Sequence, residues 1–127
     1  MFSAPQMTFY SHDLARMVAF YEAAGFRLTF RTPAEGPPDH VELALDGFKL
    51  GIALSSAAQR DHGLAADPDG AAAEVVLWTD DVDRGITQLQ DAGATPLSAP
   101  HDWLEGLRVA WVADPDGNPV QLVQHRA

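Results

Sequence analysis

The fold is decided by the stretch "QMTFYSHDLARMVAFYEAAGF" (residues 6–26), which aligns without a gap with "EVVLWTDDVDRGITQLQDAGA" (residues 74–94). At a constant offset of 68 residues the two stretches share an aspartate, an arginine, an alanine and a glycine: Asp13 with Asp81, Arg16 with Arg84, Ala24 with Ala92 and Gly25 with Gly93. Identities that keep one register indicate an internal duplication. The chain is therefore predicted to consist of two related halves.

Each half has the pattern of a βαβββ module. In the first half, residues 7–10 form a β-prone run, and a helix begins after the capping side chains of residues 11–13. The apolar residues of that helix recur at helical spacing, and Gly25 ends it. Three further segments then have strand character: "FRLTF" (26–30), "HVELAL" (40–45) and "FKLGIAL" (48–54), the last two joined at Asp46-Gly47.

The second half repeats this order. Its segments are a strand at "EVVLWT" (74–79), a helix that ends at Gly93, and strands at "LRVAWVA" (107–113) and "PVQLV" (119–123) around Asp116-Gly117. Residues 55–73 are predicted to be a polar connector. The interpretation is one domain over residues 1–127, with module one at 4–54 and module two at 74–124.

Composition excludes several classes of function. The formal net charge is −10, which disfavours nucleic acid as a partner because phosphates need a basic surface. The chain has no cysteine, so disulfides, thiolate metal sites and a cysteine nucleophile are excluded. Neither a secretory signal nor a run of about 20 apolar residues is present. We therefore expect a soluble, cytoplasmic protein without membrane contact.

With its duplicated βαβββ unit, "AFYEAAGF" at the end of the first helix and "DPDGNPVQL" near the end of the chain, the sequence resembles the vicinal oxygen chelate superfamily. That superfamily includes glyoxalase I, extradiol dioxygenases and the fosfomycin and bleomycin resistance proteins. The resemblance implies an α+β fold in which two tandem modules form a curved eight-stranded sheet around a cleft. It also implies a homodimer, since such dimers are common in the superfamily and would cover open sheet edges.

The resemblance also implies four positions for metal ligands. They fall on Gln6, on Glu74, on Gln121, and on either Ala53 or Gly51, because the hairpin turns sit 70 residues apart rather than 68. Transition metals prefer imidazole or several carboxylates, and this set offers one carboxylate and two neutral amides. We therefore expect no bound metal and no cofactor. The alternative is a divalent metal such as Ni, Mn, Fe or Zn held by an atypical Gln/Glu/Gln set.

Strand periodicity places Gln6 and Tyr10 on one face of the first strand, and Glu74 and Trp78 on one face of the strand at 74–79. A loop at "HDWLEGL" (101–107) carries Trp103. Aromatic walls with a few polar groups are typical of sites for planar or cationic small molecules. The predicted ligand-binding residues are Gln6, Tyr10, Trp78, Trp103 and Gln121.

Two functions remain open at this point. The resemblance implies a metal-free protein of the bleomycin resistance type, which confers antibiotic resistance by sequestering a planar or cationic ligand. The alternative is an enzyme, a glyoxalase-like lyase or isomerase or a dioxygenase. In that case Glu74, if desolvated in an apolar cleft, would be the catalytic general base. The facing of Phe30, Phe48 and Trp111 stays unsettled, and His125 is assigned to a surface tail.

Overall fold

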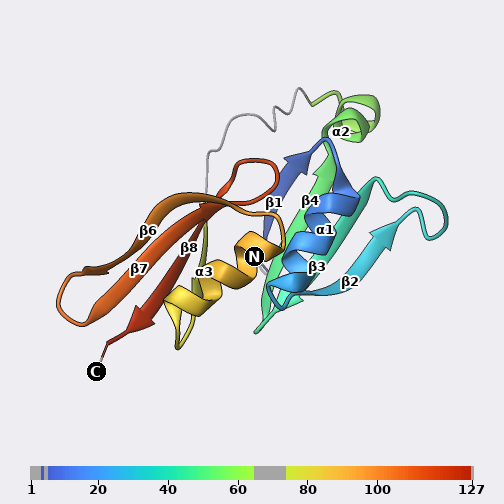
Figure 1. The fold of residues 1–127 in the computed structure, drawn as a ribbon. Coiled ribbons are helices and arrows are strands. Elements are labelled where there is room, and N and C mark those ends of the chain that lie inside the picture. Colours follow the sequence, from blue (N-terminus) through green and yellow to red (C-terminus); the bar gives the residue numbers. More distant parts are fainter. Residues whose placement is uncertain (1–3, 5, 65–73, 127) are drawn as a thin grey trace. The chain divides into compact units, whose positions relative to one another are not determined.

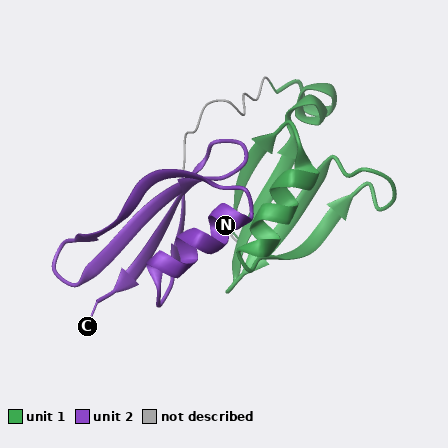
Figure 2. Cartoon of the chain, in the orientation of Figure 1, with its two compact units in different colours: residues 1–68 green, residues 69–127 purple. Residues whose placement is uncertain are grey.

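The computed structural model describes residues 4, 6–64 and 74–126. The chain divides into two compact units, residues 1–68 and residues 69–127 (Figure 2). Each unit contains one four-stranded sheet, so the eight predicted strands belong to two sheets. The architecture is the predicted α+β duplication.

The first unit forms its sheet in the order β1-β4-β3-β2. Its elements are β1 (Met7–Ser11), α1 (Leu14–Ala23), β2 (Arg27–Thr32), β3 (His40–Leu45), β4 (Phe48–Leu54) and α2 (Ser55–His62). Strand β1 pairs in parallel with β4, and the other two neighbouring pairs are antiparallel. Helix α1 lies across one face of this sheet (Figure 1), and its buried side chains Met17, Phe20 and Tyr21 pack there with Leu43 and Ile52.

The second unit repeats this topology in the order β5-β8-β7-β6. Its elements are β5 (Val75–Trp78), α3 (Val82–Asp91), β6 (Thr95–Trp103), β7 (Leu107–Ala113) and β8 (Pro119–His125). Helix α3 buries Val82, Ile86 and Leu89 against the sheet. It approaches β8 so closely that a Cβ added at Gly85 would lie 2.8 Å from Leu122 Cδ1.

The duplication extends to individual hydrogen bonds. In the first unit Ser11 Oγ accepts from the Asp13 amide at 2.9 Å, and Asp13 Oδ1 accepts from the Arg16 amide at 3.1 Å. In the second unit Thr79 Oγ1 accepts from the Asp81 amide at 3.2 Å, and Asp81 Oδ1 accepts from the Arg84 amide at 3.0 Å. The predicted cap of the first helix is therefore confirmed, and the second helix is capped in the same way.

Both helices also end in the same way. Gly25 and Gly93 have positive φ values of 106° and 109°, a conformation that favours glycine. The next amide in each module donates back into the helix, from Phe26 to Tyr21 O and from Ala94 to Leu89 O, at 2.9 Å in both. The predicted ends of both helices at these glycines are thus confirmed.

Three sequence predictions need correction. Residues 55–62 are helix α2, not connector, because Ala57 and Ala58 are buried against the first unit and Gly63 caps the helix at a φ of 67°. The remainder of the predicted connector, residues 65–73, lies outside the described residues. Trp103 is the last residue of β6 and pairs with Leu107, so it does not lie in a loop.

His125 is likewise the last residue of β8, paired with Leu107, and it does not belong to a tail. Strand β6 was not predicted, because two prolines and two register shifts interrupt its alternation at a sheet edge. Four other strands shift at their ends: β1 runs to 11, β2 covers 27–32, β5 covers 75–78 and β8 runs to 125.

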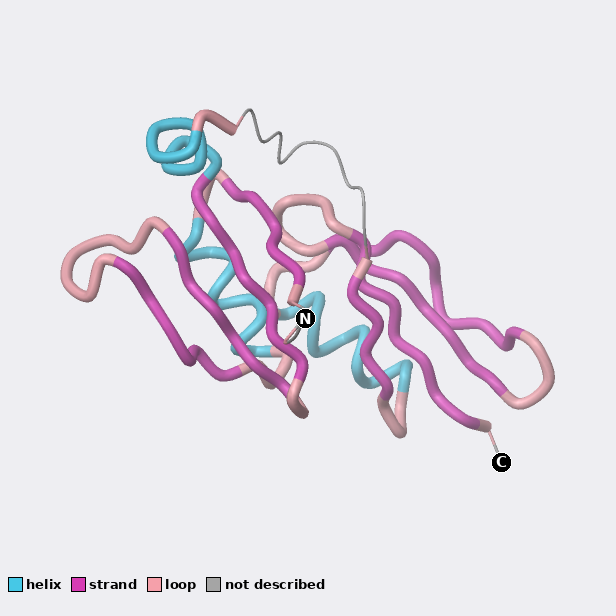
Figure 3. The backbone as a smooth tube through the Cα atoms, turned by 180° about the vertical axis from the view of Figure 1, so that it is seen from behind, coloured by secondary structure: helices cyan, strands magenta, loops and turns pink. Residues whose placement is uncertain are grey.

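Each sheet has a second face that carries neither α1 nor α3. Seen from behind in Figure 3, the strands of each unit lie in front of that unit's long helix. We call these two surfaces the helix-free faces. Among the described residues no helix is long and apolar enough to span a membrane.

Candidate ligand-binding site

The helix-free face of the second unit gathers four of the predicted site residues. Residues paired across neighbouring strands point to the same side of a sheet. Val76 on β5 pairs with Gln121 on β8, and Gln121 pairs with Trp111 on β7. Glu74 and Trp78 share the parity of Val76, and Trp111 Nε1 donates to Glu74 Oε2 at 3.0 Å. This contact settles the facing of Trp111.

Two tryptophans on this face are largely exposed. Trp78 is 58% exposed and Trp103 is 48% exposed. Trp103 pairs with Leu107, which also pairs with His125, so the three side chains occupy one row of the sheet. The His125 ring stacks on Trp78 with centroids 4.6 Å apart and an angle of 26° between the planes. Trp78 is thus a flat apolar platform that already accommodates a planar heterocycle.

A second stack lies deeper on the same face. His101 on β6 stacks on Trp111 with centroids 6.3 Å apart and planes 26° apart. Trp111 is half-buried because the Glu74 carboxylate holds its indole N–H. The face therefore contains two indole platforms, two imidazoles and one carboxylate, a combination suited to planar or cationic molecules.

Gln121 is the amide residue of this face. Its side chain is only 9% exposed, yet its amide makes no hydrogen bond with any side chain or backbone group of the described chain. Glu74, which the duplication places nearby, is engaged by Trp111 instead. The amide atoms of Gln121 are not among the enclosed side-chain atoms that lack a partner, so they keep some contact with solvent. Gln121 therefore presents an amide without a hydrogen bond to the described chain, on an otherwise aromatic surface.

Glu74 itself is exposed. The role of general base depends on a desolvated carboxylate in apolar surroundings, and the surroundings of Glu74 do not supply that desolvation. Its carboxylate accepts a hydrogen bond from the Trp111 indole. Because the residue is exposed, the carboxylate charge stays accessible to a bound cation. As a catalytic residue, Glu74 stays a prediction.

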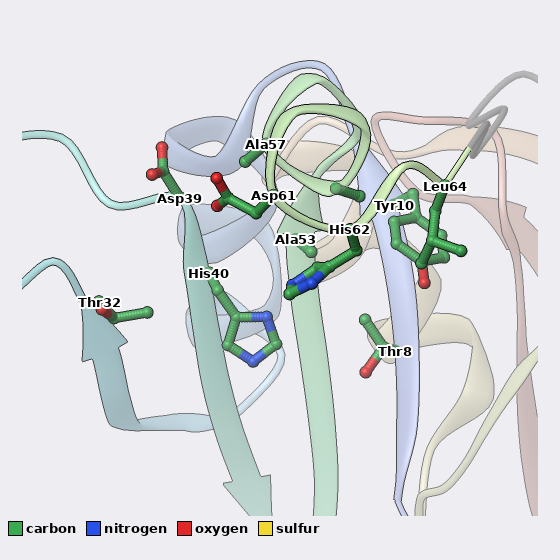
Figure 4. Close-up of a pocket in the computed structure, with 11 residues that line it drawn as sticks. Thr8, Tyr10, Thr32, Asp39, His40, Ala53, Ala57, Asp61, His62 and Leu64 are labelled. Carbon is green, nitrogen blue, oxygen red and sulfur yellow. The ribbon is translucent and has the colours of Figure 1, made fainter.

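The remaining two predicted residues belong to the first unit. Gln6 precedes β1, and its Nε2 donates to Glu42 Oε2 on β3 at 3.4 Å. Tyr10 lies on the helix-free face of the first sheet, where it lines a cavity of about 460 Å³ between the sheet and α2 (Figure 4). The predicted residues are thus distributed over both units, with four in the second and two in the first.

The register also identifies the residue that is equivalent to Gln121. Thr8 pairs with Gly51 in the first unit, and Val76, which is 68 residues after Thr8, pairs with Gln121 in the second. Gly51 and not Ala53 is therefore the counterpart. A Cβ built at Gly51 would lie 2.6 Å from Thr8 Oγ1, so a longer side chain is excluded there without rearrangement.

The four positions implied by the family do not fit a transition metal. Gly51 has no donor, Gln6 and Gln121 offer neutral amide oxygens, and the carboxylate of Glu74 is shared with an indole N–H. Such metals are held by imidazoles, thiolates and several carboxylates. Within the part of the chain that the structure describes, no group of three or more His, Asp or Glu side chains is arranged to hold a metal ion.

Sequence reasoning missed several residues of the two helix-free faces. The stacked histidines His101 and His125 were assigned to a loop and a tail, and Glu42 was not singled out. The signal for His125 was present, since it has the strand parity of Gln121. Phe30 lies on the helix-free face of the first sheet, because it pairs with Glu42, and its ring makes an edge contact with His40. Phe48 has the parity of Leu50 and faces the helix side.

Comparison with known proteins supports the topology. The structure is similar to a glyoxalase-related enzyme from Fulvimarina pelagi, with a TM-score of 0.81, 23% identity, and coverage of 98% of this chain and 89% of that one. It is also similar to hypothetical protein SA1046 from S. aureus, with a TM-score of 0.80 and 18% identity over 98% and 94% of the two chains. TioX from Micromonospora sp. ML1 matches with a TM-score of 0.74 and 24% identity over 97% and 99%.

At these identities the likeness shows the fold alone. No curated protein matches the sequence. The profile of one family, described as the Glyoxalase/Bleomycin resistance protein/Dioxygenase superfamily, matches residues 4–122. Since that match covers both modules, this chain belongs to the Glyoxalase/Bleomycin resistance protein/Dioxygenase superfamily.

Proposed function

We propose that the protein is a metal-free small-molecule-binding protein of the bleomycin resistance type, which sequesters a planar or cationic ligand on the helix-free face of its second sheet. Trp78 and Trp103 would stack against the ligand, Glu74 would attract its positive charge, and Gln121 would hydrogen-bond to it. Binding without chemical change would account for a face that has recognition groups but no desolvated acid or base.

The observation that carries this proposal is the amide of Gln121. It is nine-tenths buried, it has no hydrogen-bonding partner in the described chain, and it lies between Val76 and Trp111 on the aromatic face. The amide keeps some contact with solvent in the free protein, because its atoms are not among the enclosed side-chain atoms that lack a partner. A ligand that pairs with the amide gains hydrogen bonds for which no group of the described chain competes.

The His125 stack on Trp78 supports the class of ligand. An imidazole is a planar heterocycle that can carry a positive charge, and the structure places one on the indole at 4.6 Å. A larger planar cation would find the same platform, with the carboxylate of Glu74 on the same face. The chain's net charge of −10 favours the approach of cations as well.

Two glutamines on β8 give a matched test. Gln124 Oε1 accepts from the Val82 amide at 2.8 Å and so helps to hold α3, whereas Gln121 has no such bond. We expect Gln121→Leu to leave the free energy of unfolding nearly unchanged while weakening ligand binding at least about tenfold. Gln124→Leu should do the reverse, with a loss of about 1 kcal/mol in stability and little change in binding.

Calorimetric titration with proflavine, a planar cation, and anthraquinone-2-sulfonate, a planar anion, measures the binding. The proposal predicts that proflavine binds more tightly, and that Trp78→Ala and Trp103→Ala weaken its binding. Equal affinity of the wild type for the two probes, or unchanged proflavine affinity in Gln121→Leu and in both tryptophan variants, would contradict it. A reaction that is abolished by Glu74→Gln would instead identify an enzyme.

A further inference from the structure

The first sheet has a groove on the face that carries helix α1. Strand β2 is an edge of this sheet and lies beside the helix (Figure 1). Leu43 on β3 is fully buried, whereas Leu28, its partner on β2, is 37% exposed, so the helix leaves β2 partly uncovered. The space between α1 and β2 has a volume of about 290 Å³. We call it the α1–β2 groove, and it lies on the opposite face of the sheet from Tyr10.

The walls of this groove are mostly apolar. Helix α1 contributes Leu14, Ala15, Val18 and Ala19, and the sheet contributes Leu28 and Val41. Ala15 and Ala19 are exposed. At the equivalent positions of the second unit, 68 residues later, the exposed side chains are those of Asp83 and Thr87. The first copy of the module therefore exposes apolar side chains where the second exposes polar ones.

A cation lines the groove on the β2 side. The guanidinium of Arg31 is held in place by the loop that follows β2, since its Nε donates to Pro33 O at 3.1 Å and its Nη2 donates to Gly36 O. A guanidinium has five N–H donors, so further donors are available to a ligand. Within the described residues no carboxylate forms an ion pair with Arg31. Its positive charge is therefore fixed in position and not neutralised by the described chain.

An anion lines the groove on the helix side. Glu22 is exposed, lies in the last turn of α1 and forms no ion pair with the residues that the structure describes. A negative charge near the C-terminal end of a helix is unfavourable. The equivalent residue of the second unit is the neutral Gln90. Helix α1 therefore does not need the charge of Glu22 for its own stability.

The two charges lie at opposite ends of the groove. Residues 24–26 join α1 directly to β2, so the two elements run side by side in opposite directions. Glu22 and Leu28 are close to this connection, and Arg31 lies about 10 Å farther along β2 than Leu28. Ala15 lies about 10 Å from Glu22 along the helix. The groove thus has an apolar middle between a positive and a negative end.

We propose that the α1–β2 groove binds a linear ω-amino carboxylate, a molecule with a carboxylate at one end, an ammonium group at the other and a methylene chain between them. The carboxylate would pair with Arg31, the ammonium group with Glu22, and the chain would lie against Val18 and Leu28. Each charge of such a ligand meets its opposite, whereas a simple cation or anion meets one like charge. The face of the second sheet has no part in this site.

Four probes separate charge from length. 6-Aminohexanoate carries both charges, hexanoate only the negative one, hexylamine only the positive one, and 3-aminopropionate both on a shorter chain. Titration of the full-length, ¹⁵N-labelled chain reports affinity and location together. We expect 6-aminohexanoate to bind at least about tenfold more tightly than each of the others and to shift the amides of α1 and β2. Equal binding of hexanoate or hexylamine, shifts confined to the second unit, or no binding at millimolar concentration overturns the proposal.

The two charged residues are tested separately. Glu22→Gln should lower the affinity for 6-aminohexanoate at least about tenfold without weakening hexanoate binding. Because this change removes an unfavourable charge from the helix end, it should not lower Tm. Arg31→Gln should weaken the binding of 6-aminohexanoate but not that of hexylamine. An unchanged affinity for 6-aminohexanoate in Glu22→Gln refutes the site.

A matched pair of alanines locates the ligand. Ala19 lines the groove, whereas Ala23, which is also exposed on α1, is not among the lining residues. Ala19→Leu should fill the groove and lower the affinity for 6-aminohexanoate at least about tenfold, and Ala23→Leu should leave it within about twofold. Equal affinities in the two variants, with the fold intact by circular dichroism, contradict the proposed location.

This inference and the proposed function fail separately. Trp78→Ala in the second unit should leave the binding of 6-aminohexanoate unchanged, and Ala19→Leu should leave the binding of proflavine unchanged. An affinity for 6-aminohexanoate that falls in Trp78→Ala as much as in Ala19→Leu would show that the groove is not an independent site. That result would overturn the inference while leaving the proposed function standing.

Discussion

Gly51 and Gln121 occupy equivalent places in the two modules and present opposite chemistry to their sheet faces. Gly51 leaves room for the Thr8 hydroxyl, which would lie 2.6 Å from any Cβ at that position. Gln121 fills the same place with a side chain that is 9% exposed and ends in an amide. The first module therefore presents a hydroxyl at this place, whereas the second presents an amide beside aromatic side chains.

The contact between Gly51 and Thr8 gives a direct prediction. Gly51→Ala should lower the free energy of unfolding by about 1–2 kcal/mol, because the new methyl group meets a β-branched side chain in a packed strand pair. The combination with Thr8→Ala removes the clashing oxygen, so the double variant should recover most of the loss. Denaturant unfolding of the two single variants and the double variant measures the coupling. Additive losses would show that the hydroxyl is not the obstacle.

The elements that the sequence predicted best are those with chemical signals at both ends. Helices α1 and α3 were predicted because Asp13 and Asp81 cap their starts and Gly25 and Gly93 follow their ends. Strands β3, β4 and β7 were predicted to the residue, since each has a run of apolar and β-branched side chains next to a clear turn. Local chemistry was sufficient for these elements.

The missed elements depend on contacts between distant parts of the chain. Helix α2 has a polar sequence, and it forms because two alanines pack on the first unit and Arg60 reaches Asp39, 21 positions earlier. Strand β6 carries two prolines, and its pairing with β7 supplies the order that its own pattern lacks. The cavity was missed for the same reason, because α2 is one of its walls.

One pairing between elements is sensitive to pH. Arg108 on β7 donates to both carboxylate oxygens of Asp83 on α3, with Nε 2.8 Å from Oδ2 and Nη2 2.9 Å from Oδ1. These hydrogen bonds lower the pKa of the Asp83 carboxyl below its ordinary value. A lowered folded-state pKa means that the stabilisation is present above the unfolded-state pKa and is lost as the pH falls through the folded-state value.

We therefore expect Asp83→Asn to lower Tm by about 1–2 °C at neutral pH, a small effect because the pair is exposed. The difference between wild type and variant should shrink to nothing on acidification below the pKa of Asp83. Asp91→Asn, a change of equal charge at the other end of α3, should not lower Tm at neutral pH, because a negative charge at the C-terminal end of a helix is unfavourable. A Tm difference for Asp83→Asn that persists at low pH would show that the carboxylate charge is not its cause.

At the scale of the whole molecule, each four-stranded sheet taken alone has two edge strands, β1 and β2 in the first unit and β5 and β6 in the second. Edge strands carry unpaired backbone groups that association can cover. All four edges expose large apolar side chains, among them Phe30 on β2, which is 48% exposed, and Leu97 on β6, which is 55% exposed. Dimerisation, which is expected from the sequence, would cover these unpaired backbone groups and apolar side chains.

We predict that the full chain sediments as a dimer, and that a lysine at the edge used for association shifts it to monomer. Phe30→Lys and Leu97→Lys probe the edges β2 and β6 separately, and lysine is a side chain with which natural sheets block their edges. Sedimentation equilibrium over a range of concentrations measures the molecular mass of the wild type and of both variants. A wild-type chain that stays monomeric at all of them would contradict the prediction.

The repeated hydrogen bonds at the helix ends have a consequence for how this protein can change over generations. They specify the βαβββ frame from positions such as Asp13 and Asp81, and none of them involves a residue on a helix-free face. Mutation can therefore exchange side chains on those faces without removing the helix caps, although close contacts such as that of Gly51 with Thr8 restrict some positions. Pairs such as Thr8 and Val76 show how far two copies of one ancestral unit have diverged there, and a combinatorial library at such positions should yield folded proteins with new ligands.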